Sequence, residues 1–170
     1  MTRIDLSTDV DVTWRTVVGE ARAYLAGDVW LPVPFKDMQA VAYSIRERVL
    51  RRGWWGTDYA GVAQNKSQYN AWGDPKCLRV MRDPFGSGED PAVIWRALSA
   101  AVSAVYGRDE DCPLRVFRDG VELLPTHYHN RDEEPPVWAT DPQTVEIHPT
   151  WDSPFRYYCN VPGNPPRAKR

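Results

Sequence analysis

The chain has 170 residues, of which 42% are hydrophobic and 26% are charged, and these values exclude collagen, a coiled coil and full-length disorder. A chain of this length can bury a substantial core as one domain without disulfides or a structural metal. The formal net charge of -2, from 21 basic and 23 acidic residues, argues against a dominant nucleic-acid-binding or membrane-binding surface.

Two amphipathic segments open the predicted helical core. An apolar stripe that follows acidic residues and stops at Gly27 predicts a helix over about 11–26. A second stripe, closed by Gly53, predicts a helix over about 36–52.

Residues 53–90 are rich in Gly, Pro, Asn and Asp, so we expect a long loop with one short helix over about 58–63. A third long helix is predicted after this loop. Asp90 caps it, Pro91 takes its first position and Gly107 lies just past its end.

The last third of the chain predicts short extended segments over 114–117 and 144–147, separated by prolines. We expect a single domain over 1–160 and an extended, solvated basic tail over 161–170. The predicted fold is therefore mainly α, with a helical core, long loops and a few short strands.

The aromatic content is dominated by rings with a polar group, with 8 Trp and 8 Tyr against 4 Phe. Such rings are enriched where a surface is both apolar and wet, as in carbohydrate-binding and peptide-binding grooves.

Cysteine spacing and chain hydropathy indicate the compartment. Cys77, Cys112 and Cys159 form no CxxC pair, so we expect reduced thiols and neither a disulfide framework nor a four-cysteine zinc site. No apolar run reaches the length of about 18 residues that a membrane-spanning helix needs. The charged N-terminus lacks the apolar stretch of a signal peptide, so we expect synthesis in the cytoplasm and another route to any site of action outside it.

Glu20 is the candidate for acid–base chemistry. Gly19 precedes it inside a predicted helix, where glycine costs about 1 kcal/mol relative to alanine, so we expect a close approach to the backbone there. The helical neighbours of Glu20 are mostly apolar, and a protein roof over them would raise its pKa, as a general acid requires. The alternative is a solvated glutamate paired with Arg15 or Arg22.

Amide and ring side chains alternate in Gln68, Tyr69, Asn70 and Trp72 of the long loop. Amides hydrogen-bond sugar hydroxyls and N-acetyl groups, while aromatic faces pack on sugar rings. The alternative is an ordinary loop whose Trp72 docks into the core.

Two histidines suggest a second kind of chemistry. On a strand, His127 and His129 would point the same way, and with His148 and a carboxylate they would suit zinc. Without a clear third ligand they fit better as the polar edge of a groove, so we expect no metal and no cofactor.

Four motifs in this order resemble the cell wall hydrolase family that includes spore cortex-lytic enzymes and many phage lysins. Residues 14–22 resemble the family's GEAR segment, and residues 39–49 resemble its AVAxVxxNRV helix. Residues 68–72 are similar to its QFSxW loop, and residues 126–130 with 136–139 are similar to its ThYh and PxWa stretch.

The resemblance implies a lysozyme-like α+β fold and cleavage of the β-1,4 bond between N-acetylmuramic acid and N-acetylglucosamine in peptidoglycan. Glu20 matches the family's catalytic glutamate, which would protonate the glycosidic oxygen and then act as base. By the same resemblance, five residues would line the saccharide groove: Gln68, Tyr69 and Trp72 on one wall, with Tyr128 and His129 on the opposite wall.

A lytic transglycosylase uses the muramyl C6 hydroxyl in place of water, so one carboxyl suffices. No second carboxylate stands at an obvious fixed spacing from Glu20, which agrees with that mechanism and leaves a water-using muramidase open. Two positions depart from the family pattern, Glu47 at the Asn of its NRV motif and Phe155 at the His of its C-terminal motif.

We therefore expect a peptidoglycan glycosidase of the endolysin type that acts on glycan strands of the host wall after release or as part of a phage particle, with no nucleic-acid partner and no membrane insertion. A second interpretation keeps the fold and makes the protein a non-catalytic wall-binding or virion component. A third is a zinc amidase or endopeptidase built on the three histidines.

Overall fold

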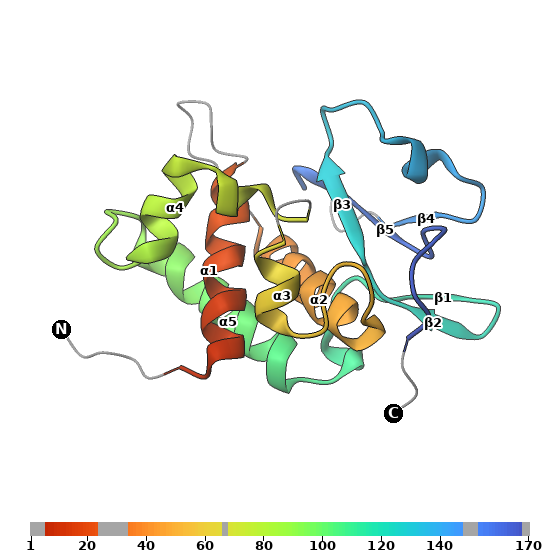
Figure 1. Ribbon diagram of the computed structural model, residues 1–170, viewed down its shortest axis with the longest axis horizontal. Helices are drawn as coiled ribbons and strands as arrows, with labels where there is room; N and C mark the ends of the chain where they lie inside the picture. Colours follow the sequence, from red (N-terminus) through yellow and green to blue (C-terminus); the bar gives the residue numbers. More distant parts are fainter. Residues whose placement is uncertain (1–5, 24–33, 66–67, 148–152, 168–170) are drawn as a thin grey trace.

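The computed structural model of the protein describes residues 6–23, 34–65, 68–147 and 153–167. It combines helix and sheet, with 49% helix and 13% strand. Figure 1 shows the helices gathered on one side of the molecule and the strands on the other. The mixed α and β content that we expected is confirmed.

The described residues form five α-helices and three 3₁₀ helices. These are α1 (Thr8–Ala23), α2 (Phe35–Arg51), α3 (Tyr59–Ala63), η1 (Asn70–Gly73), α4 (Pro75–Arg82), α5 (Pro91–Tyr106), η2 (Asp109–Asp111) and η3 (Val137–Thr140).

The long helices follow the predicted stripes with shifted ends. Helix α2 differs from its predicted range by one residue at each end. Helix α1 begins at Thr8, three residues before the predicted start, because the Ser7 hydroxyl accepts a hydrogen bond from the Val10 N–H and caps the first turn. The predicted residues 24–26 lie outside the described residues.

The capping signals predicted for α5 are confirmed, and the predicted short helix over about 58–63 is present as α3. The Asp90 side chain accepts from the Ala92 N–H at 2.8 Å, and the Gly107 N–H donates to the last turn of α5. The Asp58 side chain caps α3 through the Gly61 N–H at 2.7 Å.

Helix α4 was not predicted, because it lies inside the stretch that we interpreted as loop. Asp74 caps it by accepting from the Lys76 N–H at 2.7 Å, and Pro75 takes its first position. The same Asp-Pro pair opens α5, so the signal was present in the sequence and we interpreted it as a turn.

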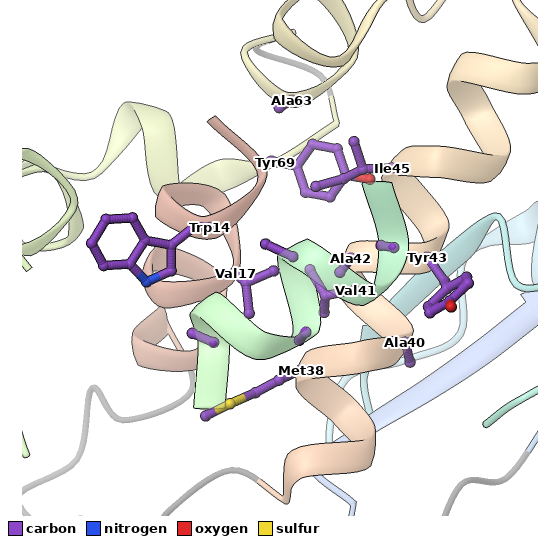
Figure 2. Close-up of a cluster of buried hydrophobic side chains, with 14 of the residues drawn as sticks. Trp14, Val17, Met38, Ala40, Val41, Ala42, Tyr43, Ile45, Ala63 and Tyr69 are labelled. Carbon is purple, nitrogen blue, oxygen red and sulfur yellow. The ribbon is translucent and has the colours of Figure 1, made fainter. Parts of the chain in front are cut away.

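The core lies where α5 packs against both α1 and α2. Figure 2 shows Trp14 and Val17 of α1 and Met38 of α2 around the central helix. The Trp14 indole also donates to the Ile94 carbonyl at 3.2 Å, which fixes α1 on α5. Glu20 of α1 and Arg48 of α2 belong to this helical layer.

A two-stranded hairpin joins the helical layer to the sheet. Strands β1 (Val116–Arg118) and β2 (Val121–Leu123) pair antiparallel around Asp119 and Gly120, both with positive φ. Such a two-residue Asp-Gly loop suits the twist of a hairpin. Strand β1 confirms the predicted extended segment over 114–117 in part, because residues 116 and 117 are in the strand whereas Leu114 lies in a turn. Strand β2 was not predicted.

The second sheet has the order β3 (His127–Asn130), β5 (Phe155–Cys159) and β4 (Val145–Ile147), with both pairs antiparallel. Strand β4 confirms the predicted segment over 144–147. We did not predict β5, although it is the central strand and sets the position of β3.

The prediction of a solvated tail is wrong for two of its described residues. Val161 is 5% exposed, and Arg167 pairs with Glu47 of α2 and with Asp109 of η2. These contacts hold residues 161–167 against the domain, because a buried carboxylate on α2 needs a counter-ion.

Cys77, Cys112 and Cys159 are all buried and free. Within the described ranges, no helix has the length and apolar character that crossing a membrane requires.

Candidate active site

Glu20 lies in the last turn of α1, where η1 and β3 cover it, and it is 6% exposed. Its Oε1 accepts a hydrogen bond from the Ala71 backbone N–H at 3.0 Å. Its Oε2 accepts one from the Tyr128 hydroxyl at 2.6 Å. Both carboxyl oxygens are therefore held by neutral donors from distant parts of the chain.

Gly19 makes this arrangement possible. A Cβ built on Gly19 would lie 2.5 Å from the Met81 Sδ and 2.7 Å from the Ala71 Cβ. The absence of a side chain lets η1 approach α1 closely enough for the Ala71 N–H to reach Glu20. The close approach that we predicted beside Glu20 is confirmed.

Burial raises the pKa of the Glu20 carboxyl above its ordinary value. The hydrogen bonds from Tyr128 and Ala71 and the charge of Arg48 oppose this shift, but desolvation outweighs them. A carboxyl in this environment keeps its proton to higher pH, which is the property of a general acid.

The alternative of a solvated Glu20 paired with an arginine is wrong, since the carboxyl is buried. Arg15 pairs instead with Asp11 at 2.9 Å and donates to the Met81 and Arg82 carbonyls. The side chain of Arg22 lies outside the described residues.

Tyr128 is aimed at Glu20 by the sheet. It pairs with Tyr157 in the register of β3 on β5, and its ring packs at 5.3 Å from Phe155 and 5.7 Å from Tyr157, measured between centroids. These contacts hold the ring, so the hydroxyl reaches Glu20. Tyr128, predicted as part of the far wall of a groove, contacts the candidate acid directly.

A pocket of about 360 Å³ is lined by Tyr128, the hydrogen-bond partner of Glu20, and not by Glu20 itself. It contains two predicted groove residues, Gln68 and Tyr128. The full lining is Arg48, Trp54, Gln68, His127, Tyr128, Trp138, Val161, Pro162, Gly163 and Asn164.

Arg48 of α2 is the main site residue that we did not predict. It is 3% exposed, and its Nε donates to the Thr126 carbonyl at 2.7 Å. Its guanidinium lies over the rings of Trp55 at 5.7 Å and Tyr69 at 5.1 Å. Two features of the sequence could have identified Arg48. It lies in the segment that resembles the NRV motif, and an arginine inside an apolar helical stripe indicates a buried charge.

Tyr69 and Trp72 do not line the described pocket. Tyr69 is 1% exposed, and its hydroxyl bonds with the Ser44 Oγ at 3.1 Å, so its predicted place on the groove wall is wrong. Trp72 is half-buried, packs on the core and donates from its indole to the Thr16 Oγ1 at 3.0 Å. Both follow the alternative in which the loop docks its rings into the core, because a large ring gains more free energy by burial there.

The two histidines of β3 have different surroundings. His127 lines the pocket, and burial together with Arg48 and Arg51 lowers its pKa to about 3, so it is neutral at neutral pH. His129 stacks on Tyr158 and its Nε2 bonds with the Tyr158 hydroxyl at 2.8 Å, so it is not placed beside Glu20.

His148, the third residue of the zinc interpretation, lies outside the described residues. Within the ranges that are described, no group of three or more His, Cys, Asp and Glu side chains is arranged to hold a metal ion.

Comparisons of the chain with protein-family models, with curated proteins and with solved structures find no match.

Proposed function

We propose that the protein is a peptidoglycan glycosidase with a lysozyme-like fold, and that Glu20 is its catalytic acid and base. The observation that carries the proposal is the setting of Glu20, a buried carboxyl of raised pKa held by Tyr128 and Ala71. The pocket that Tyr128 lines offers tryptophan rings and amides, which suit a sugar.

In the proposed reaction, Glu20 gives its proton to the glycosidic oxygen as the bond from that oxygen to the muramyl C1 breaks. The Glu20 carboxylate then takes the proton of the muramyl C6 hydroxyl as this oxygen bonds to C1. The products are an anhydromuramyl end and a free N-acetylglucosamine hydroxyl, and Glu20 regains its proton.

One carboxyl is enough for this cycle, which is why we favour a lytic transglycosylase over a muramidase. Among the described groups that shift the pKa of Glu20 there is no second carboxylate. A retaining or inverting hydrolase with two carboxyls places both beside the scissile bond. Lysis of a host cell wall by a phage-type enzyme is the proposed setting.

The test is mass spectrometry of the soluble fragments that purified sacculi release on treatment with the wild-type protein, Glu20→Gln and Glu110→Gln. Gln has the shape of Glu and carries no acidic proton, so we expect release by Glu20→Gln to fall about 10²- to 10⁴-fold. Glu110 is exposed on η2 and serves as the matched control, with wild-type rates expected.

The chemistry of the fragment ends decides between the mechanisms. Anhydromuramyl ends support the transglycosylase, and reducing muramyl ends mean that water is the acceptor. Equal release by the wild type and Glu20→Gln would refute the role of Glu20. Binding to sacculi without release by any of the proteins would favour the non-catalytic wall-binding interpretation.

A further inference from the structure

The pocket that Tyr128 lines contains a buried cation without a counter-ion. Arg48 is 3% exposed, and its Nη1 is buried with no hydrogen-bond partner. Across the part of the chain that the structure describes, Arg48 takes part in no ion pair. Its neighbours on the same helix differ, since Arg46 pairs with Asp109 at 3.2 Å and Arg51 pairs with Glu47 at 2.8 Å.

The direct contacts of Arg48 are with neutral groups. The rings of Trp55 and Tyr69 lie against its guanidinium, and its Nε bonds to a backbone carbonyl. The acid whose charge it influences is Glu20, and burial favours the neutral form of that carboxyl. Buried charges in proteins are paired, so this guanidinium lacks the partner that its burial calls for.

The rest of the pocket is uncharged at neutral pH. Among its described lining residues, Arg48 is the only one with a formal charge, because His127 is neutral there. Trp54 is 59% exposed and, with Trp138, offers apolar ring surface beside the cation. A ligand that fits this lining has a sugar or peptide body and one anionic group.

We propose that this pocket is a subsite for a carboxylate carried by the glycan substrate, with the Arg48 guanidinium as its counter-ion. The inference rests on the proposed function, which supplies the class of substrate. Guanidinium is the protein group best suited to a carboxylate, because its planar N–H donors match the two oxygens.

Peptidoglycan offers this carboxylate from two sources. The lactyl group of N-acetylmuramic acid has a free carboxylate once the stem peptide is removed, and intact strands carry carboxylates on the stem peptide. A glycan made only of N-acetylglucosamine has neither. The subsite would therefore let the protein bind peptidoglycan in preference to chitin-like strands, which have the same β-1,4-linked sugar backbone.

The test measures binding of three tetrasaccharides to Glu20→Gln, which is expected not to cleave them. The first is built of N-acetylglucosamine alone, the second alternates N-acetylglucosamine with peptide-free N-acetylmuramic acid, and the third carries stem peptides. We expect at least one of the two acidic ligands to bind about 10-fold or more tightly than the neutral one. The better of the two acidic ligands identifies the source of the carboxylate.

Substitutions of Arg48 in the same background locate the effect. Arg48→Gln is expected to remove the preference, and Arg48→Lys to keep part of it, because lysine retains the charge and loses the planar pair of donors. Arg96→Gln, at an exposed position of α5, is the control for general attraction of anions and is expected to keep the full preference. Thermal unfolding of each variant shows whether it is folded.

Equal binding of all three ligands by Glu20→Gln overturns the proposal, and this comparison does not depend on an Arg48 variant that folds. A preference that survives in folded Arg48→Gln overturns the assignment to Arg48. The sacculus assay described above tests the proposed function separately. Fragment release without a preference for acidic ligands refutes the carboxylate subsite alone. A preference for acidic ligands without fragment release refutes the glycosidase activity alone.

Discussion

Two buried glutamates of this protein differ in what holds them. Glu20 is 6% exposed and receives hydrogen bonds from the Tyr128 hydroxyl and the Ala71 N–H, whereas Glu47 is 2% exposed and pairs with the guanidiniums of Arg51 and Arg167. Burial raises the pKa of both carboxyls. At Glu47 the main opposing effect is the positive charge of two arginines, and at Glu20 it is hydrogen bonding by neutral groups.

This difference is the reason why we propose Glu20, and not Glu47, as the catalytic acid. The arginines around Glu47 join α2 to the C-terminal segment, and their positive charges oppose the rise of the Glu47 pKa. The neutral donors around Glu20 are compatible with both the protonated and the ionised carboxyl. The Glu20 proton can therefore leave and return without an ion pair being broken. Burial alone does not identify the functional acid, because the type of partner decides its role.

The largest expected change in stability is at Glu47. Glu47→Gln leaves Arg51 without its counter-ion and leaves Arg167 paired with Asp109 alone. We expect a loss of about 3 kcal/mol in the free energy of unfolding, the lower end for a broken buried pair, because Arg167 keeps one partner and both arginines are partly solvated. Urea unfolding measures this loss. Glu110→Gln breaks the exposed pair with Arg108 and is expected to change stability by less than about 0.5 kcal/mol. Similar losses of stability in Glu47→Gln and Glu110→Gln would show that the buried ion pairs of Glu47 contribute no more to stability than an exposed pair does.

The close approach at Gly19 is expected to have the next largest effect. The Cβ of Gly19→Ala would overlap Met81 and Ala71, so we expect a net loss of about 1–2 kcal/mol in stability. The shift of η1 away from Glu20 should also lower the rate of fragment release. Gly73→Ala is the matched control, since a Cβ on Gly73 meets nothing within 4 Å. A Gly19→Ala protein with wild-type stability and rate would show that the approach is not needed.

The raised pKa of Glu20 predicts how stability depends on pH. The folded protein keeps the Glu20 proton at pH values where the unfolded chain, with a pKa near 4.5, has lost it. This contribution to stability is full below that value and is lost as pH rises through the folded pKa. Glu20→Gln has no such loss.

Unfolding of the wild type and Glu20→Gln between pH 4 and pH 8 measures this difference. We expect Glu20→Gln to gain stability relative to the wild type as pH rises, with a slope no steeper than about 1.4 kcal/mol per pH unit, the limit for one proton. A gap that stays constant with pH would mean that the Glu20 pKa is not raised.

The smallest expected effect is at Tyr128. Its hydroxyl stabilises the ionised form of Glu20, so Tyr128→Phe should raise the Glu20 pKa further. Because the acid works in its protonated form, the alkaline limb of kcat/KM against pH should move to higher pH. Tyr69→Phe is the control, since its hydroxyl bonds to Ser44 instead of Glu20. If the alkaline limb of Tyr128→Phe does not shift, the Tyr128 hydroxyl does not influence the pKa of the catalytic acid.

Much of the secondary structure could be predicted from local patterns in the sequence. The Asp90-Pro91 start of α5 and the apolar stripe of α2 were interpreted correctly, because capping and helical periodicity act within a few residues. Helix α4 was missed although Asp74 and Pro75 carry the same signal. Strand β5 was missed because it is defined by pairing with β3 and β4, which are distant in sequence.

The sequence by itself identified Glu20 as the candidate acid, since Gly19 inside a helix and the order of the motifs both pointed to it. It did not determine what surrounds that carboxyl. Ala71 and Tyr128 lie 51 and 108 residues away along the chain, and only packing brings them to it. The same packing placed Tyr69 in the core and Arg48 in the lining of the pocket. The burial of a side chain depends on every element that covers it, whereas the apolar periodicity of a helix can be read from that helix alone.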